Sequence, residues 1–208
     1  MSLQGTKKVG LIGGSFDPVH SGHLMIAQDA ADRLELDEVV FIPANIPPHK
    51  QDQQRVSAEH RLNMLRLATE SNLRFTVSSI EIDRGGVSYT FDTVCELRAD
   101  QPDAELVLIV GSDTLVDLPN WYNVQELLEI ADVATLVRPG DVDLAAIEAK
   151  LALDPELRDR LMGQLYDSRL VDISSSEIRA RVAEGLGVKY LVPPEVEMYI
   201  FEHGLYQN

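Results

Sequence analysis

Short apolar runs alternate with amphipathic stretches along most of the chain. The runs are rich in branched side chains, as is typical of buried strands, and they occupy residues 8–12, 39–43, 75–80, 106–110, 133–137 and 170–173. Apolar residues at helical spacing predict helices at residues 24–36, 58–70, 90–98, 175–184 and 194–203. Strands separated by helices indicate an α/β fold, a doubly wound parallel sheet followed by a small C-terminal helical portion at about 174–208.

This pattern predicts one domain that spans residues 1–208. In open parallel sheets, ligands bind beyond the carboxyl ends of the strands. The loops that begin after residues 12, 42, 80, 110 and 137 are therefore expected to line one crevice. Residues 140–168 are charged and weakly helical, and they contain no chemical motif.

The charge of the chain narrows the classes of partner. Its 34 acidic against 18 basic side chains give a formal charge of -16, which repels nucleic acids and anionic membranes, so neither is expected as a partner.

Cys95 is the single cysteine, which excludes an intrachain disulfide. No apolar run reaches membrane length, and the first residues lack the apolar stretch of a signal peptide. We expect a cytoplasmic protein, with oligomers left open.

The first loop carries two histidines after a pair of glycines. It reads Gly13-Gly14-Ser15-Phe16-Asp17-Pro18-Val19-His20-Ser21-Gly22-His23. The glycines let the backbone approach a ligand, and the histidines flank a helix start, where free N–H groups and the helix dipole favour an anion. The alternative is a tight turn with one histidine as a cap. No third nitrogen or sulfur ligand lies nearby, so we expect phosphate binding and no metal site.

A second helix start is rich in hydroxyl groups. It reads Ile173-Ser174-Ser175-Ser176-Glu177-Ile178-Arg179. Ser174 and Glu177 match a capping box, which explains only those two residues. Ser175, Ser176 and Arg179 add donors suited to the β and γ phosphates of a nucleotide. We therefore expect the two helix starts to converge on one triphosphate.

Both motifs resemble signatures of one known superfamily. The first loop resembles the G-G-[ST]-F-D-P-x-H-x-G-H signature of the nucleotidyltransferases, and the serine-rich helix start resembles their I-S-S-[ST]-x-I-R motif. Other segments are similar to bacterial nicotinate-nucleotide adenylyltransferases, namely residues 43–50, 88–93, 111–113, 121, 138–140 and 205–206. The resemblance implies a Rossmann-like fold and adenylyl transfer from ATP to nicotinic acid mononucleotide, a step of NAD biosynthesis.

The resemblance also implies which residues bind the two substrates. ATP would contact Gly13, Gly14, Ser15, Phe16, His20, His23, Gly111, Asp113, Ser175, Ser176 and Arg179. The acceptor would contact Asn45, Lys50, Tyr89, Thr90 and Trp121. Among these, Lys50 would hold the acceptor phosphate, Thr90 the carboxylate, and Trp121 would stack on the pyridine ring. Simpler alternatives are a core position for Trp121 and a solvated loop charge for Lys50.

The expected catalysis needs no general base. A phosphate monoester has a second pKa of about 6, so the acceptor is already mostly dianionic near neutral pH. The enzyme then has to align two anions and stabilise charge, for which His20, His23, Lys50 and Arg179 are the catalytic candidates. Mg²⁺ would be bound mainly through the ATP phosphates.

Three alternatives remain open. The acceptor could be nicotinamide mononucleotide, which differs by one charged group, or another small phosphate such as phosphopantetheine or a polyol phosphate. From a different class, the chain could be a non-catalytic sensor that binds ATP. A dinucleotide-dependent redox enzyme is disfavoured, because the first loop lacks the G-x-G-x-x-G fingerprint.

Overall fold

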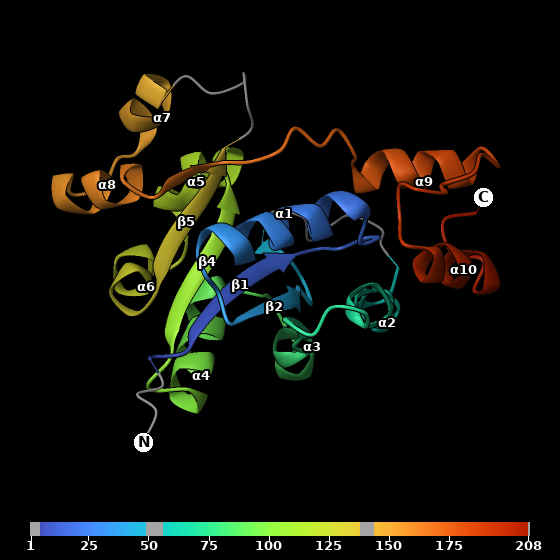
Figure 1. Ribbon diagram of the computed structural model, residues 1–208, viewed down its shortest axis with the longest axis horizontal. Helices are drawn as coiled ribbons and strands as arrows, with labels where there is room; N and C mark the ends of the chain where they lie inside the picture. Colours follow the sequence, from blue (N-terminus) through green and yellow to red (C-terminus); the bar gives the residue numbers. More distant parts are fainter. Residues whose placement is uncertain (1–4, 49–55, 138–143, 208) are drawn as a thin grey trace. The chain divides into compact units, whose positions relative to one another are not determined.

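The computed structural model describes residues 5–48, 56–137 and 144–207. Its strands form one sheet in the order β3-β2-β1-β4-β5-β6 (Figure 1). They are β1 (Lys8–Gly14), β2 (Glu38–Pro43), β3 (Phe75–Val77), β4 (Glu105–Gly111), β5 (Asp132–Val137) and β6 (Leu165–Asp167). The pairs β1–β4, β4–β5 and β5–β6 are parallel. This order is that of a Rossmann sheet and confirms the predicted doubly wound fold.

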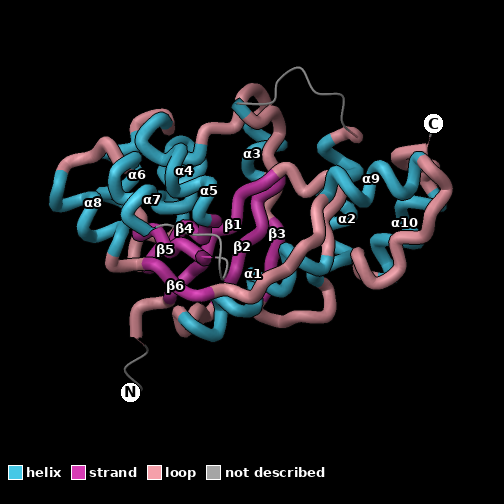
Figure 2. Tube along the Cα trace, turned by 90° about the horizontal axis from the view of Figure 1, so that it is seen from above, coloured by secondary structure: helices cyan, strands magenta, loops and turns pink. Residues whose placement is uncertain are grey.

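Helices occupy most of the chain between the strands (Figure 2). They are α1 (Ser21–Arg33), α2 (Ala58–Thr69), α3 (Ile80–Arg84), α4 (Thr90–Asp100), α5 (Ser112–Asp117), the 3-10 helix η2 (Leu118–Asn120), α6 (Val124–Ile130), α7 (Leu144–Lys150), α8 (Pro155–Met162), α9 (Ser175–Ala183) and α10 (Pro194–Glu202). As predicted, Ser174 caps α9, since its hydroxyl accepts the N–H of Glu177. None of the helices in the described residues has the length and apolar character that a membrane span needs.

Two strand predictions need correction. The predicted strand at residues 75–80 ends at Val77, because Ser78 and Ser79 lead into α3, which begins at Ile80: the Ser78 hydroxyl accepts the N–H of Ile80. The predicted strand at residues 170–173 is irregular, and Leu170 is 66% exposed. The last strand is instead β6, which pairs with residues 135–137 of β5.

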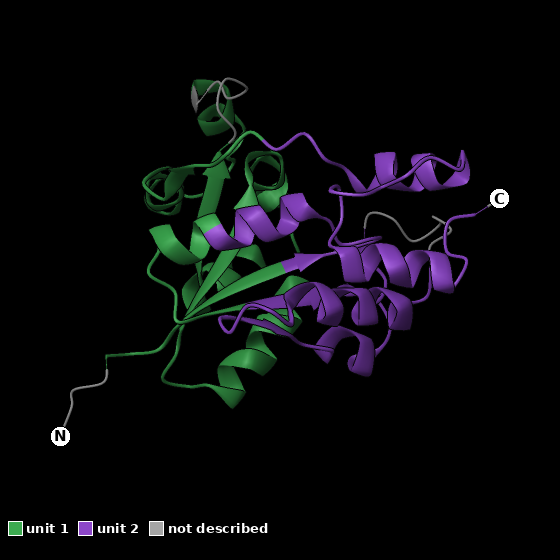
Figure 3. Cartoon of the chain, turned by 45° about the vertical axis from the view of Figure 1, so that its right-hand side comes forward, with its two compact units in different colours: residues 1–12, 29–39, 89–170 green, residues 13–28, 40–88, 171–208 purple. Residues whose placement is uncertain are grey.

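The chain divides into two compact units (Figure 3). Unit 1 comprises residues 1–12, 29–39 and 89–170, and unit 2 comprises residues 13–28, 40–88 and 171–208. In unit 1, helices α5, α6 and α8 pack on β5. A Cβ atom added to Gly10 of β1 would lie 2.5 Å from Leu36 and 2.7 Å from Ile109, so a larger residue there would force the ends of these side chains to shift. The prediction of one domain stays a prediction.

Unit 2 holds the C-terminal helices. Helix α2 packs on β3 and on α10. The apolar core of this unit includes eight residues that are 0% exposed, namely Val19, Ala27, Phe41, Met64, Leu65, Ile178, Val196 and Ile200. The loop after β1 and the start of α9 both belong to unit 2. The two segments therefore belong to the same compact unit.

Candidate active site

The loop after β1 and the start of α9 are joined by hydrogen bonds. The Ser175 hydroxyl donates to the carbonyl oxygen of Pro18 over 2.9 Å, across 157 positions of sequence. Nη1 of Arg179 donates to the carbonyl oxygen of Asp17 over 2.7 Å. Both bonds lie just before His20, so the expected convergence of the two helix starts is confirmed. The roles of these residues toward ATP stay predictions.

His20 and His23 form a stacked pair at the start of α1. Their ring centroids lie 3.7 Å apart with 28° between the planes. The backbone N–H of His20 donates to Nδ1 of His23 over 3.2 Å, so the neutral His23 ring carries its proton on Nε2. His20 is 6% exposed, and within the described part of the chain its Nδ1 has no hydrogen-bond partner. The pair thus has one donor of fixed direction and one buried nitrogen without a partner among the described residues.

The surroundings keep both imidazoles neutral at neutral pH. Burial lowers the pKa of His20 from 6.5 to about 4. Burial, and after it the charge of His20, lowers the pKa of His23 to about 3. The rings would therefore meet phosphate oxygens as hydrogen-bond donors rather than as cations.

These pKa shifts predict a loss of stability in mild acid. In the unfolded chain each histidine binds a proton near 6.5, and in the folded protein only near 4 and 3. Below pH 6.5 the unfolded state therefore holds more protons, and the free energy of unfolding falls as pH falls toward 4. The slope is at most about 1.4 kcal/mol per pH unit for each histidine.

Urea unfolding at about pH 7 and about pH 5 measures this fall, because the interval lies within the window of the shifted pKa values. A double variant, His20→Asn with His23→Asn, should lose less stability over this interval than the wild type. An equal fall in the two proteins would contradict the neutral, buried state of the pair.

Phe16 supports the histidine pair by packing. Gly13 and Gly14 end β1, and a Cβ atom on Gly14 would lie 3.1 Å from the Phe16 ring. Phe16 is 2% exposed, and its ring centroid lies 5.0 Å from that of His23 in an edge contact. The ring therefore forms part of the core beneath the pair, and its predicted contact with ATP stays a prediction.

The remaining predicted residues of unit 2 lie in two places. Ser176 accepts a hydrogen bond from Nη2 of Arg179 over 3.2 Å at the start of α9. Asn45 follows β2, and its Nδ2 donates to the carbonyl oxygen of Gly86 over 2.9 Å. Lys50 lies outside the described residues, as does the segment 138–140.

The other predicted acceptor residues belong to unit 1. Thr90 begins α4, and no side chain among the described residues caps this helix start. Tyr89 precedes it, and its ring centroid lies 4.8 Å from that of Tyr122, which is 52% exposed. Trp121 is partly exposed after η2. Tyr122 was not predicted, although its place beside Trp121 was an available signal.

Gly111 ends β4 and Asp113 lies in the first turn of α5, also in unit 1. A Cβ atom on Gly111 would lie 2.6 Å from Oδ1 of Asp113, so the carboxylate folds over this glycine. The predicted residues therefore divide between the units: the two helix starts and Asn45 belong to unit 2, whereas Tyr89, Thr90, Gly111, Asp113 and Trp121 belong to unit 1. The predicted crevice would draw on loops of both units, and it stays a prediction.

Two polar residues of unit 2, one buried and one partly buried, were missed by the sequence prediction of the site. Arg61 of α2 is 2% exposed and donates to the carbonyl oxygens of Ser15, over 2.8 Å, and Asn45, over 3.3 Å. The hydroxyl of Tyr206 donates to Oδ1 of Asp17 over 2.8 Å. Each residue thus holds the first loop from a different part of the chain.

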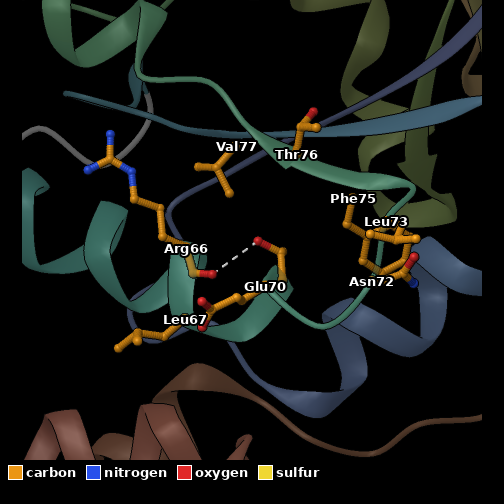
Figure 4. Close-up of a pocket in the computed structure, with 9 residues that line it drawn as sticks. Arg66, Leu67, Glu70, Asn72, Leu73, Phe75, Thr76 and Val77 are labelled. Atoms are coloured by element: carbon orange, nitrogen blue, oxygen red, sulfur yellow. Dashed lines mark hydrogen bonds between the residues drawn. The ribbon is translucent and has the colours of Figure 1, made fainter.

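A pocket of about 580 Å³ lies elsewhere on unit 2 (Figure 4). Its lining residues come from the end of α2, from β3 and from the turn between them, and they are Arg66, Leu67, Thr69, Glu70, Asn72, Leu73, Phe75, Thr76 and Val77. None of these nine is a predicted site residue. The pocket is therefore not part of the candidate active site.

Comparison with known proteins places the chain in a family. The family model described as Cytidylyltransferase-like matches residues 11–181, which include both motifs. The chain is 43% identical over 202 residues to "Probable nicotinate-nucleotide adenylyltransferase" of Thermomicrobium roseum, covering 97% of this chain and 92% of the relative. It is 45% identical to the protein of the same name from Herpetosiphon aurantiacus, covering 96% and 98%.

A solved structure shows the same fold. The structure of Plasmodium falciparum nicotinic acid mononucleotide adenylyltransferase complexed with NaAD superposes with a TM-score of 0.73 at 19% identity. It covers 96% of this chain and 97% of the Plasmodium chain. With the matched family model and the relatives above, the chain belongs to the cytidylyltransferase-like nucleotidyltransferases, and among them to the nicotinate-nucleotide adenylyltransferases.

Proposed function

We propose that the protein transfers the adenylyl group of ATP to nicotinic acid mononucleotide, giving nicotinic acid adenine dinucleotide and pyrophosphate. The observation that carries this proposal is the contact between α9 and the first loop, in which Ser175 and Arg179 hold the backbone just before His20. It places hydroxyl, guanidinium and imidazole donors in one packed unit. Relatives more than 40% identical over almost the whole chain carry the name of this activity.

The reaction follows from the state of these groups. An oxygen of the acceptor phosphate attacks the α-phosphorus of ATP, a P–O bond forms, and the bond to the β-phosphate breaks as pyrophosphate leaves. No proton has to be removed from the dianionic nucleophile, so the neutral His20 and His23 need not act as bases. Their N–H groups and the Arg179 guanidinium would stabilise charge on the transferred and departing groups.

The acceptor would be recognised by residues of unit 1. The backbone N–H groups at the start of α4, next to Thr90, suit a carboxylate, and Trp121 and Tyr122 offer aromatic faces for a pyridine ring. A neutral amide would satisfy such donors less well than a carboxylate, because hydrogen bonds to charged groups are the stronger ones. This difference favours nicotinic acid mononucleotide over nicotinamide mononucleotide.

We expect Mg²⁺ to enter the site bound to the phosphates of ATP. Among the residues that the structure describes, no three His, Cys, Asp or Glu side chains gather as a metal cage. The ion would be held mainly by phosphate oxygens and water, and Asp113 is the one carboxylate among the residues predicted to bind ATP. It would supply positive charge to the triphosphate.

Pyrophosphate release with a panel of acceptors tests the function. We expect kcat/KM for nicotinic acid mononucleotide to exceed that for nicotinamide mononucleotide by about tenfold or more. Phosphopantetheine and a polyol phosphate serve as the other acceptors, and ATP alone is the control. Equal rates with the two mononucleotides would refute the acceptor assignment, and no release with any acceptor would favour the sensor.

A further inference from the structure

The last turn of the chain folds back into unit 2. Helix α10 ends at Glu202, and Gly204 and Tyr206 have positive φ angles of 58° and 62°. Between them, Leu205 is 7% exposed, and its N–H donates to the carbonyl oxygen of Ile200 over 2.9 Å. Left-handed backbone is uncommon for a tyrosine, so this turn is held by its packing and its hydrogen bonds.

The turn brings a hydroxyl group to a buried carboxylate. Asp17 is 3% exposed, and its Oδ1 accepts the hydrogen bond from Tyr206 over 2.8 Å. The carbonyl oxygen of the same residue accepts from Nη1 of Arg179. Asp17 stands three residues before His20, and the intervening Val19 is 0% exposed. In so closely packed a segment, a movement of Asp17 is passed to the histidine.

The phenol remains a hydrogen-bond donor at any working pH. Burial, then the charge of Asp17 and the hydrogen bond to it, raises the pKa of Tyr206 well above its ordinary value. The charges of Arg179 and Arg61 act in the opposite direction but are outweighed. The bond from Tyr206 to Asp17 is therefore charge-assisted, which is the stronger class of hydrogen bond.

We propose that Tyr206 is a positioning residue for adenylyl transfer, which acts through Asp17 to hold the loop that carries His20 and His23. The proposal rests on the function proposed above. Without the hydroxyl, the Asp17 carboxylate would stay buried with one donor fewer, and a buried charge that loses a donor is costly. The loop would relieve this cost by moving the carboxylate toward water, and the histidines would leave their positions.

Tyr206→Phe tests the proposal, because it removes only the hydroxyl and keeps the ring. We expect kcat to fall about tenfold, with KM values changed much less, since the substrates' own contacts remain. Tyr199→Phe is the matched control: it removes, in the same unit, a hydroxyl that lies 2.9 Å from Nδ1 of His60. This control should keep the wild-type kcat. A kcat of Tyr206→Phe near that of wild type, or an equal loss in both variants, would overturn the proposal.

A double-mutant cycle separates action through Asp17 from general destabilisation. In an Asp17→Asn background the side chain that accepts the hydrogen bond from Tyr206 carries no charge. Adding Tyr206→Phe should therefore lower kcat by a much smaller factor than it does in the wild type. Asp17→Asn also changes the hydrogen bond between Tyr206 and Asp17 from its other side. If the two substitutions multiply their separate effects, Tyr206 does not act through Asp17 and the proposal fails.

Hydrogen exchange of the free protein tests the same contact without the reaction. In Tyr206→Phe, amides of residues 13–23 should exchange faster, and in Tyr199→Phe they should not. Unchanged exchange in this segment would overturn the positioning role. A wild-type protein that releases no pyrophosphate would instead refute the proposed function, and the exchange experiment would still decide whether Tyr206 holds the loop.

Discussion

Replacing His23 with asparagine lowers kcat by about 10²-fold or more and leaves the fold intact. The amide oxygen of asparagine takes the place of Nδ1, which accepts the N–H of His20 over 3.2 Å, so the local hydrogen bond is kept. The change removes the Nε2–H donor. Because burial lowers the pKa of His23 to about 3, this donor is neutral and fixed in direction before substrate arrives. Preorganised donors of this kind give the largest single contribution in many transfer enzymes.

His20→Ala is expected to show a loss of similar size. The ring of His20 stacks on that of His23 at 3.7 Å, so its removal takes away a contact that holds the His23 ring in place. His203→Ala is the matched control, since His203 lies in the same unit and is exposed after α10. Steady-state pyrophosphate release is measured for all three variants, with circular dichroism to check folding. Full activity in His20→Ala and His23→Asn would end the assignment of catalysis to the pair.

The central strands were predictable because strands buried on both faces have apolar residues at nearly every position. The runs that became β1, β2, β4 and β5 are apolar at nearly every position, and their burial on both faces follows from the parallel sheet. In β6, by contrast, only three residues of mixed polarity pair with β5. The position of β6 depends on its pairing with β5, which the sequence of β6 alone does not indicate. The prediction of a strand at the more apolar residues 170–173 was therefore wrong.

The two helix starts of the candidate site were predictable for a local reason. A glycine pair followed by two histidines, and a serine cap followed by an arginine, each determine the backbone within a few residues. The hydrogen bond from Tyr206 to Asp17 spans 189 positions, and no local pattern indicates it. Such contacts become visible only when the packing is known.

Arg61 is an intermediate case. It lies four residues before Leu65, so it falls on the apolar face of α2, and a charged residue on such a face is a signal. The sequence does not say what the guanidinium would bind. In the structure it holds the carbonyl oxygens of two loops that follow neighbouring strands, at Ser15 and Asn45. Its partners are backbone atoms, which carry no sequence signature.

Replacing Arg179 with glutamine is expected to lower kcat/KM by about 10²-fold or more, because one guanidinium has two duties. Nη1 donates to the carbonyl oxygen of Asp17 over 2.7 Å, and Nη2 donates to the Ser176 hydroxyl over 3.2 Å. The same group is the cation proposed for the triphosphate. Its loss would release the first loop and remove the charge that binds the nucleotide.

Lysine at position 179 separates the two duties. An ammonium group restores the charge but lacks the planar fork that reaches the Asp17 carbonyl and the Ser176 hydroxyl together, so Arg179→Lys should recover only part of kcat/KM. The matched control is Arg181→Gln on the same helix, where Nε donates to the carbonyl oxygen of Gly187 over 3.0 Å. It should keep wild-type kinetics. Full activity of Arg179→Gln would refute both proposed roles of the guanidinium, whereas full recovery by lysine would show that charge alone is required.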